Sequence, residues 1–202
     1  MIRILLYIKH HLTFLWSMAE WCNGLVFSIA YKNKVAKITE KICREYSKDD
    51  MVFRCVEEAD LANLTAFFTA QPEESYRYFK PHDFDEKTLV KLWHNPAFSQ
   101  LIVTNRSNQI AGYFLIRFFV NKKAFVGFLV GESFQGRGIA KQMCRIALKI
   151  CWDNKFRTFA TVSKDNTRAL AAYRRINDFI ILKELPDNYI YIEYTPNGMK
   201  EE

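Results

Sequence analysis

The segment Gln135-Gly136-Arg137-Gly138-Ile139-Ala140 places two glycines where a strand pattern gives way to a helix pattern. Residues 124–130 are mostly apolar and predict a strand, and apolar side chains recur at helical spacing after Gly138. The first turn of a helix presents unpaired N–H groups and the positive end of its dipole, which attract anions. Gly136 and Gly138 have no Cβ, so a phosphate can approach their backbone, and Arg137 adds a positive charge. The segment therefore predicts a pyrophosphate-binding loop.

Two common phosphate-binding loops do not fit this segment. The dinucleotide fingerprint G-x-G-x-x-G requires a third glycine where this chain has Lys141. The P-loop requires Lys followed by Ser or Thr, and this chain has Arg137 and Gly138 at those positions. The pattern that residues 135–140 do satisfy is Q-x-x-G-x-[GA].

The rest of the chain predicts strands and helices in mixed order, which indicates an α+β fold. Residues 71–85 form a long irregular segment dense in aromatic and charged side chains, a type of loop that is often functional. Gly127, inside a strand pattern, predicts a bulge or a close approach of a ligand, and Asn177 predicts a left-handed helix cap. The expected elements are strand 51–56, a helix from residue 57, helix 86–93, an antiparallel meander of strands 98–104, 109–119 and 124–130, a helix after residue 138, strand 157–163, helix 166–176, and a hairpin of strands 179–185 and 189–194.

A second motif follows the loop at the start of the helix over 166–176. Asn166, Ala169 and Tyr173 stand at the spacing common in the GNAT N-acetyltransferase superfamily, whose coenzyme A pyrophosphate motif is Q-x-x-G-x-[GA]. The order of elements over 51–195 resembles a whole GNAT domain. The resemblance implies a central, mostly antiparallel twisted sheet flanked by helices, with an N-terminal helical extension. A second likeness, to bacterial GNAT proteins of cell-surface polysaccharide and nucleotide-sugar assembly, rests on residues 78–82 and 184–189.

The GNAT resemblance also implies a role for particular residues. Tyr173 would act as general acid and protonate the departing thiolate. Asn166 would bond the pantetheine arm through its side-chain amide. The co-substrate would be acetyl-CoA, attacked directly by an amine, with no metal and no covalent enzyme intermediate. The cofactor-binding set that it implies is the backbone of Leu129 and Val130 for pantetheine, the loop residues Gln135, Gly136, Arg137, Gly138, Ile139 and Ala140 for pyrophosphate, and Asn166.

The general base is left open by the sequence. An ammonium acceptor must lose a proton before it attacks. Glu132 follows the strand next to the loop, and His82 titrates near neutrality. We take Glu132 and His82 as first candidates, with Glu73, Glu74 and Asp83 as alternatives.

The basic charge of the chain is concentrated near its N-terminus. Residues 1–48 hold eight Lys and Arg against three Asp and Glu, whereas the other residues are nearly balanced. A nucleic-acid partner is therefore not expected. Residues 2–20 predict a mostly apolar helix that Asn23-Gly24 ends, and residues 33–47 predict an amphipathic helix. These helices are expected to pack on the body of the protein or on a twin subunit, or to lie on a membrane surface; no uncharged run is long enough to span one.

The cysteines bear on the expected cellular location, and the order of segments bears on the expected domain boundaries. The five cysteines are an odd number without a C-x-x-C pair, which favours a reducing compartment. The expected location is cytoplasmic, at the inner face of the membrane if the extension binds lipid. The expected divisions are an extension over 1–48, a GNAT domain over 49–196 and a tail over 197–202.

These observations favour an acetyl-CoA-dependent N-acetyltransferase whose acceptor is a small amine, such as an amino sugar or nucleotide-sugar. One alternative is acetylation of a protein or peptide amine. Another, from a different class, is a non-catalytic acyl-CoA-binding module tethered by its N-terminal helices.

Overall fold

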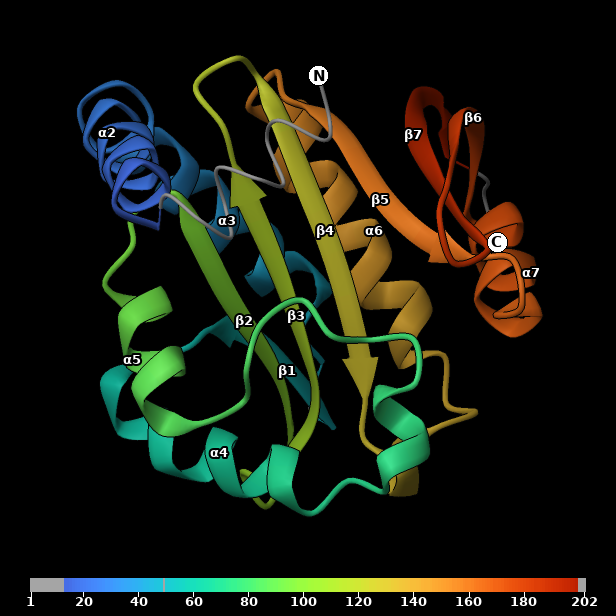
Figure 1. Ribbon diagram of the computed structural model, residues 1–202. Helices are drawn as coiled ribbons and strands as arrows, with labels where there is room; N and C mark the ends of the chain where they lie inside the picture. The colour runs from blue at the N-terminus through green and yellow to red at the C-terminus, as the bar shows by residue number, and fades with distance from the viewer. Residues whose placement is uncertain (1–12, 49, 200–202) are drawn as a thin grey trace.

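The computed structural model describes residues 13–48 and 50–199, which form one mixed α/β body (Figure 1). The expected mixture of helices around a mostly antiparallel sheet is confirmed. The elements, in chain order, are α2 (Thr13–Ala30), α3 (Lys32–Tyr46), β1 (Met51–Cys55), η1 (Glu58–Asp60), α4 (Leu61–Thr69), η2 (Glu73–Tyr76), α5 (Glu86–Trp93), β2 (Phe98–Asn105), β3 (Ile110–Phe118), β4 (Lys123–Val130), η3 (Glu132–Phe134), α6 (Ile139–Asp153), β5 (Arg157–Ser163), α7 (Thr167–Ile176), β6 (Asn177–Leu185) and β7 (Tyr189–Met199).

The strand order in the sheet is β1-β2-β3-β4-β5-β7-β6. Strands β1 to β4 pair antiparallel, and so do β5, β7 and β6. The two halves meet at β4 and β5, which are parallel and pair only over Lys123–Phe125 with Arg157–Phe159. Beyond those residues the two strands diverge, as Figure 1 shows. This divergence opens the sheet at its centre.

Both faces of the sheet are covered by apolar layers. Strand β3 supplies alternate side chains to each layer, because successive residues of a strand point to opposite faces. Phe114 and Ile116 pack with α3 and α6, and Tyr113 and Leu115 pack with α4, α5 and the 71–85 segment. That segment crosses in front of β3 and β4 (Figure 1). The core therefore fixes the 71–85 segment over the diverging strands.

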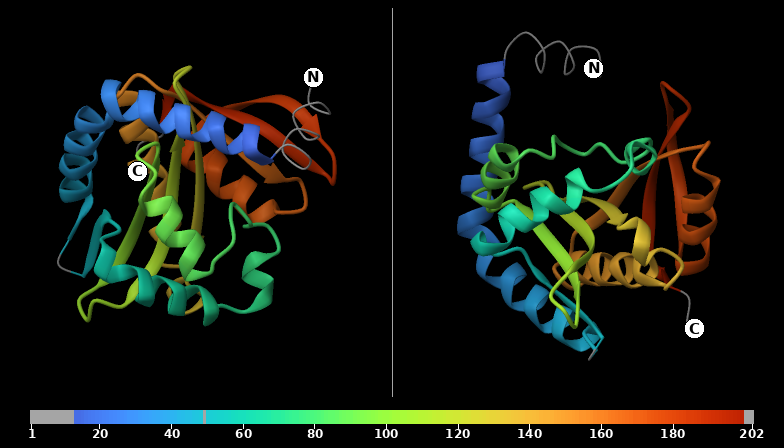
Figure 2. Two further views of the ribbon diagram at one scale, coloured as in Figure 1. Left: turned by 60° about the vertical axis from the view of Figure 1, so that its left-hand side comes forward. Right: turned by 90° about the horizontal axis from the view of Figure 1, so that it is seen from below.

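The N-terminal helices pack on the body. Phe27 on α2 and Ile42 on α3 are fully buried in the layer that contains α6. Figure 2 shows both helices along one side of the molecule, with the β6–β7 hairpin along the opposite side. Packing on the body is thus observed for the described part of residues 1–48; the expected helix over 2–20 lies mostly outside the described residues.

The expected helix break at Asn23-Gly24 was wrong, because α2 runs through both residues to Ala30. The Asn23 side chain makes two tertiary hydrogen bonds. Its Nδ2 donates to the Phe118 carbonyl and its Oδ1 accepts from the Val120 N–H, both at 3.0 Å. A Cβ on Gly24 would lie 3.3 Å from Asn95 Oδ1. The two residues let the helix approach the sheet closely, and the packing outweighs their low helix propensity.

Two smaller expectations differ from the structure. Strand β4 keeps regular register through Gly127, so the bulge, one of the two alternatives expected there, is absent. Asn177 is extended and begins β6, with its Nδ2 donating to the Thr195 carbonyl at 3.1 Å, so it joins β6 to β7 instead of capping α7 in a left-handed conformation. Strand β7 extends to Met199 and includes part of the expected tail.

Candidate active site

A cavity of about 310 Å³ occupies the gap between the diverging strands. One wall is β4 from Val126 to Val130, and the other is β5 from Ala160 to Ser163. These stretches follow directly after the last paired residues of the two strands. Backbone groups of β4 that would otherwise pair with β5 therefore face the cavity, where an extended ligand can bond to them as an added strand does.

Strand alternation decides which residues of β4 face the gap. The Lys123 carbonyl accepts from the Phe119 N–H, one residue past β3, and the Gly131 N–H donates to the Ala111 carbonyl of β3. The odd-numbered residues between Lys123 and Gly131 therefore direct their backbone toward β3. Phe128 and Val130 direct theirs toward the gap. Of the two residues that the family resemblance implies for pantetheine, Val130 has the required backbone orientation. Leu129 contributes its side chain to the cavity wall.

The glycine loop closes one end of the cavity. Gly136 and Gly138 have φ of 78° and 76°, a left-handed conformation that favours glycine. Helix α6 begins at Ile139, so its first N–H groups lie beside the loop. A Cβ on Gly138 would meet no atom within 4 Å, so the space above the loop is open for a phosphate. The loop residues that line the cavity are Gln135, Gly136, Gly138, Ile139 and Ala140.

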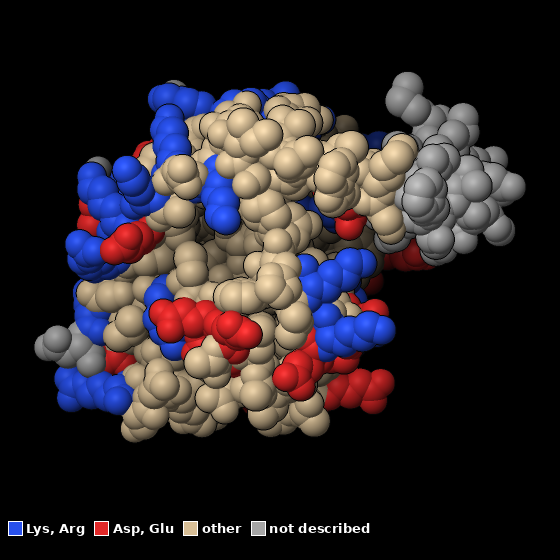
Figure 3. Space-filling model, turned by 90° about the vertical axis from the view of Figure 1, so that its left-hand side faces the viewer, with Lys and Arg blue, Asp and Glu red and all other residues tan. Residues whose placement is uncertain are grey.

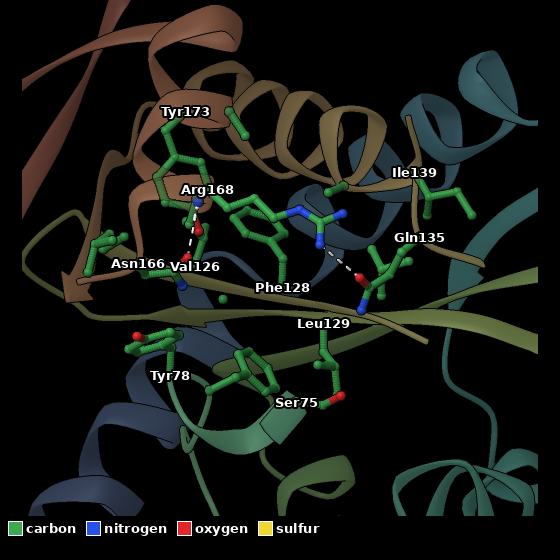
Figure 4. Close-up of a pocket in the computed structure, with 18 of the residues that line it drawn as sticks. Ser75, Tyr78, Val126, Phe128, Leu129, Gln135, Ile139, Asn166, Arg168 and Tyr173 are labelled. Atoms are coloured by element: carbon green, nitrogen blue, oxygen red, sulfur yellow. Dashed lines mark hydrogen bonds between the residues drawn. The ribbon is translucent and has the colours of Figure 1, made fainter. Parts of the chain in front are cut away.

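The cation beside this loop is Arg168, and the sequence analysis missed it. Arg137 does not line the cavity: its Nη2 donates to the Ser133 carbonyl at 3.2 Å and its guanidinium lies over the Phe134 ring. Arg168 lines the cavity, and its Nη1 donates to Gln135 Oε1 at 3.0 Å, as Figure 4 shows. The signal was present, because Arg168 lies in the first turn of the helix that Asn166 begins.

Asn166 holds the start of α7 at the cavity wall. Its Oδ1 accepts a hydrogen bond from the Ala169 N–H at 3.1 Å, which makes Asn166 the N-cap of the helix. Because the oxygen is used for capping, the amide nitrogen is the group that can donate to a ligand in the cavity.

Tyr173 lies two turns further along α7 and faces the same cavity (Figure 4). Its ring meets those of Phe128 and Tyr194 at centroid distances of 6.3 and 5.8 Å. Burial raises the pKa of Tyr173 well above its usual value, with a further contribution from the Cys144 thiol. The hydroxyl is therefore protonated at neutral pH, as a proton donor must be.

The 71–85 segment forms a third wall of the cavity, on the other side of β4 from α7. Ser75, Tyr78 and Phe79 line the cavity across β4 from α7, as Figure 4 shows for the first two. A Cβ on Gly127 would lie 3.1 Å from the Phe79 ring. Gly127 is therefore approached closely by an aromatic side chain of this segment, whereas the expected alternative was approach of a ligand.

Neither candidate general base lines this cavity. Glu132 is exposed on η3 and borders a second cavity beside α4. The His82 side chain packs among aromatic rings between the 71–85 segment, to which it belongs, and β3. Its Nε2 lies 3.0 Å from Tyr113 Oη and its Nδ1 2.6 Å from the Asp83 carbonyl oxygen. Burial lowers the pKa of His82, so the ring is neutral at pH 7. Its bonding is that of a structural histidine.

The cysteines also lie outside the cavity wall. All five are free thiols. Burial raises the pKa of Cys144 and of Cys151 to about 12 in each case, so both are protonated and poor nucleophiles. Over residues 13–48 and 50–199, no group of His, Cys, Asp and Glu side chains has an arrangement that could hold a metal ion. Within the same residues no helix is both long and apolar enough to cross a membrane.

The family model for the acetyltransferase (GNAT) family matches residues 61–179, more than half of the chain. The chain belongs to the GNAT acetyltransferase family. The resemblance drawn from the two motifs is thereby confirmed. Among curated proteins, no relative matches the sequence.

Solved structures show the same fold at low sequence identity. The GNAT domain of PAT from S. lividans aligns with a TM-score of 0.62 and 18% identity, covering 71% of this chain and 89% of that one. A GCN5-related N-acetyltransferase from Kribbella flavida aligns with a TM-score of 0.59 and 17% identity, covering 74% and 99%. A spermidine N-acetyltransferase from Vibrio cholerae, in complex with CoA and spermine, aligns with a TM-score of 0.55 and 17% identity, covering 73% and 94%.

Proposed function

We propose that this protein transfers the acetyl group of acetyl-CoA to a primary amine by direct attack. The observation that carries the proposal is that one cavity is lined by the glycine loop, the unpaired edge of β4 and Tyr173. The first two provide sites for the pyrophosphate and the pantetheine of acetyl-CoA. The third provides a proton donor.

Each part of the cavity has a definite task. The N–H groups of the loop and of the first turn of α6 bind pyrophosphate oxygens, assisted by the positive charge of Arg168. The backbone of Phe128 and Val130 bonds to the amides of the pantetheine arm, and Asn166 adds its side-chain N–H. These contacts fix the thioester in the gap between β4 and β5.

The chemistry requires one bond to form and one to break. The neutral amine attacks the thioester carbonyl carbon, the new C–N bond forms and the C–S bond breaks as the tetrahedral intermediate collapses. Tyr173 donates its proton to the departing sulfur, a contribution of about 10²–10⁴-fold in rate. The nitrogen releases one proton to water, and water returns a proton to Tyr173, so that CoA thiol and the acetylated amine are the products. Because neither Glu132 nor His82 lines the cavity, replacing either with Gln should leave the pH dependence of kcat/KM unchanged; an altered profile would restore that residue as the base.

The proposed acceptor is an amino sugar or nucleotide-sugar. Tyr78 and Phe79 present aromatic rings on which a sugar ring can stack, and Ser75 presents a hydroxyl. The described residues that line the cavity include no Asp or Glu, and a cavity without carboxylates suits a sugar acceptor better than a polycation such as spermine. The Vibrio cholerae enzyme, by contrast, was solved with spermine.

Free thiols and the use of acetyl-CoA support a cytoplasmic location.

An acceptor panel tests the proposal. Nucleotide-linked amino sugars, peptide amines and spermidine are each incubated with acetyl-CoA, and CoA release is measured for the wild type and for Tyr173→Phe. We expect amino-sugar turnover and a fall in kcat of about 10²–10⁴-fold for the variant, with little change in KM for acetyl-CoA. Tyr191→Phe is the matched control, since Tyr191 lies on β7 outside the cavity lining.

Three outcomes would change the proposal. Turnover of peptide amines alone would indicate a protein or peptide acetyltransferase. CoA binding without release by any amine would favour a non-catalytic acyl-CoA-binding module. Normal turnover by Tyr173→Phe would show that the assigned acid is wrong.

A further inference from the structure

The outer face of α2 is a continuous apolar surface that no described segment of the chain, residues 13–48 and 50–199, covers. Five large hydrophobic side chains recur there at helical spacing, and two of them, Trp21 and Ile29, are 66% and 81% exposed. In Figure 3 this face forms an uncharged ridge along the top of the molecule. The five residues, named here the α2 ridge, are Met18, Trp21, Leu25, Val26 and Ile29.

The opposite face of α2 is firmly attached to the sheet. Phe27 is 1% exposed and stacks on Phe118 at a centroid distance of 5.0 Å. Asn23 bonds the backbone at the end of β3, and Glu20 forms an ion pair with Arg117. The helix is therefore held in one rotation about its axis, and the α2 ridge faces outward as a consequence of packing.

Among the described residues, positive charge lies at the C-terminal end of the ridge and not along it. Glu20 is the one charged residue of α2, and it is paired with Arg117 beside the sheet. Exposed Lys32 and Lys34 follow at the C-terminal end, and Lys122 lies beside them, with Nζ 3.8 Å from the centroid of the Tyr31 ring. Figure 3 shows Lys and Arg bordering this end of the ridge. In the sequence, Arg3 and Lys9 precede α2.

We propose that the α2 ridge binds the surface of a membrane that contains anionic lipids, with α2 lying in the plane of the interface. Apolar side chains with a tryptophan enter the boundary between headgroups and acyl chains. Lysines at the end of the ridge meet anionic headgroups, each contributing favourably near the surface. This surface is separate from the acetyl-CoA cavity, so the inference does not depend on the proposed function.

A second copy of the chain fits the ridge less well than lipid does. A twofold axis brings the same patch of each copy together. In a parallel or an antiparallel arrangement, the partner's α2 offers no free carboxylate to Lys32 and Lys34, because Glu20, the one acidic residue of α2, is paired with Arg117. An anionic membrane does offer these lysines negative charge.

Vesicle co-sedimentation of the full chain tests the proposal. Vesicles of phosphatidylcholine are compared with vesicles that also contain phosphatidylglycerol. The wild type should bind the second kind more tightly, and added salt should weaken the binding. Trp21→Glu with Ile29→Glu should reduce binding by about tenfold or more, because charge is placed on the inserting face. Lys32→Gln with Lys34→Gln should lose about fivefold per lysine, and only on the anionic vesicles.

The matched control is Ile180→Glu with Ile181→Glu. These side chains are exposed on the edge strand β6, on the opposite side of the molecule (Figure 2), and should have no effect on vesicle binding. Unchanged Tm and unchanged CoA affinity would confirm that each variant is folded. Equal vesicle binding by the wild type and by the double variant Trp21→Glu, Ile29→Glu would overturn the proposal. A second result would also overturn it: light scattering shows that the wild type is a dimer, the wild type does not bind vesicles, and the double variant is a monomer.

Discussion

Gly138 offers the sharpest test of the pyrophosphate loop, because a substitution there has two separable effects. In the free protein, a Cβ at φ 76° meets no atom within 4 Å, so Gly138→Ala costs only backbone strain. That strain is about 1–2 kcal/mol for a residue in the left-handed region. In a chain of this size, 1 kcal/mol corresponds to about 2–4 °C in Tm. Without ligand, the Tm of Gly138→Ala should fall by about 2–8 °C.

The second effect appears only with CoA. A larger side chain, as in Gly138→Leu, enters the open space above the loop and displaces the pyrophosphate from its N–H donors. A hydrogen bond to a charged group contributes about 1.5–3 kcal/mol. Losing one weakens CoA binding by about 10- to 150-fold. Gly138→Ala should show an intermediate loss.

Thermal shift with and without CoA measures both effects. At a CoA concentration of about 100 times the wild-type Kd, binding stabilises the wild type by about 2.7 kcal/mol, or about 5–11 °C. A variant with about 30-fold weaker binding gains about 0.9 kcal/mol, or about 2–4 °C. Ile42→Val is the control, because it removes one buried methylene on α3 at a cost of about 0.5–1.5 kcal/mol and should keep the full CoA shift.

Two results would refute this reasoning. A full CoA-induced shift in Gly138→Leu would mean that the loop does not hold the pyrophosphate. An unchanged Tm of the free Gly138→Ala variant would mean that the left-handed conformation at residue 138 carries no strain for alanine.

Three further predictions concern charge and thiol chemistry. Arg54 hydrogen-bonds Asp60 with N–O distances of 2.5 and 2.8 Å and lowers the pKa of Asp60. Asp60→Asn should cost about 1–3 kcal/mol at pH 7 in denaturant titrations. Because the folded pKa of Asp60 is depressed, this difference should be complete above about pH 4 and should shrink as pH falls from there through the folded pKa; a constant difference would contradict the assignment. Arg168→Gln should raise the Kd for CoA in calorimetry more than Arg137→Gln does, because only Arg168 lines the cavity; equal effects would contradict this. Cys144, whose pKa is raised to about 12, should react with iodoacetamide at pH 8 about 10³-fold more slowly than a free thiol, as followed by mass spectrometry; fast labelling of the folded protein would contradict its burial.

The elements and the two motifs could be predicted because their signals are local. Gly138 needs a left-handed backbone whatever surrounds it, and Asn166 caps the helix that contains Tyr173 seven residues later. Periodicity over a few residues likewise predicted the meander and the closing hairpin. These features depend on backbone geometry within about one or two turns of chain.

Features that depend on distant contacts were predicted poorly. Asn23 and Gly24 are helix breakers in isolation, but their contacts with Phe118 and Asn95 keep α2 intact. The position of Arg168 in the first turn of α7 was a signal in the sequence. Only the packing of α7 beside the glycine loop shows that Arg168 reaches Gln135 while Arg137 turns to Ser133.

The sequence alone determined the family, the order of the elements, and the loop and tyrosine proposed to serve the acetyl-CoA half of the reaction, because short segments encode strand, turn and helix directly. Tertiary structure alone decided which side chains line the cavity. Packing between elements far apart in the chain has three consequences here. It separates β4 from β5, holds His82 away from the cavity and turns one face of α2 outward. That packing sets the direction of each side chain. The direction of the side chains in turn determines which cation lines the site, which groups an acceptor meets and which surface is proposed to bind a membrane.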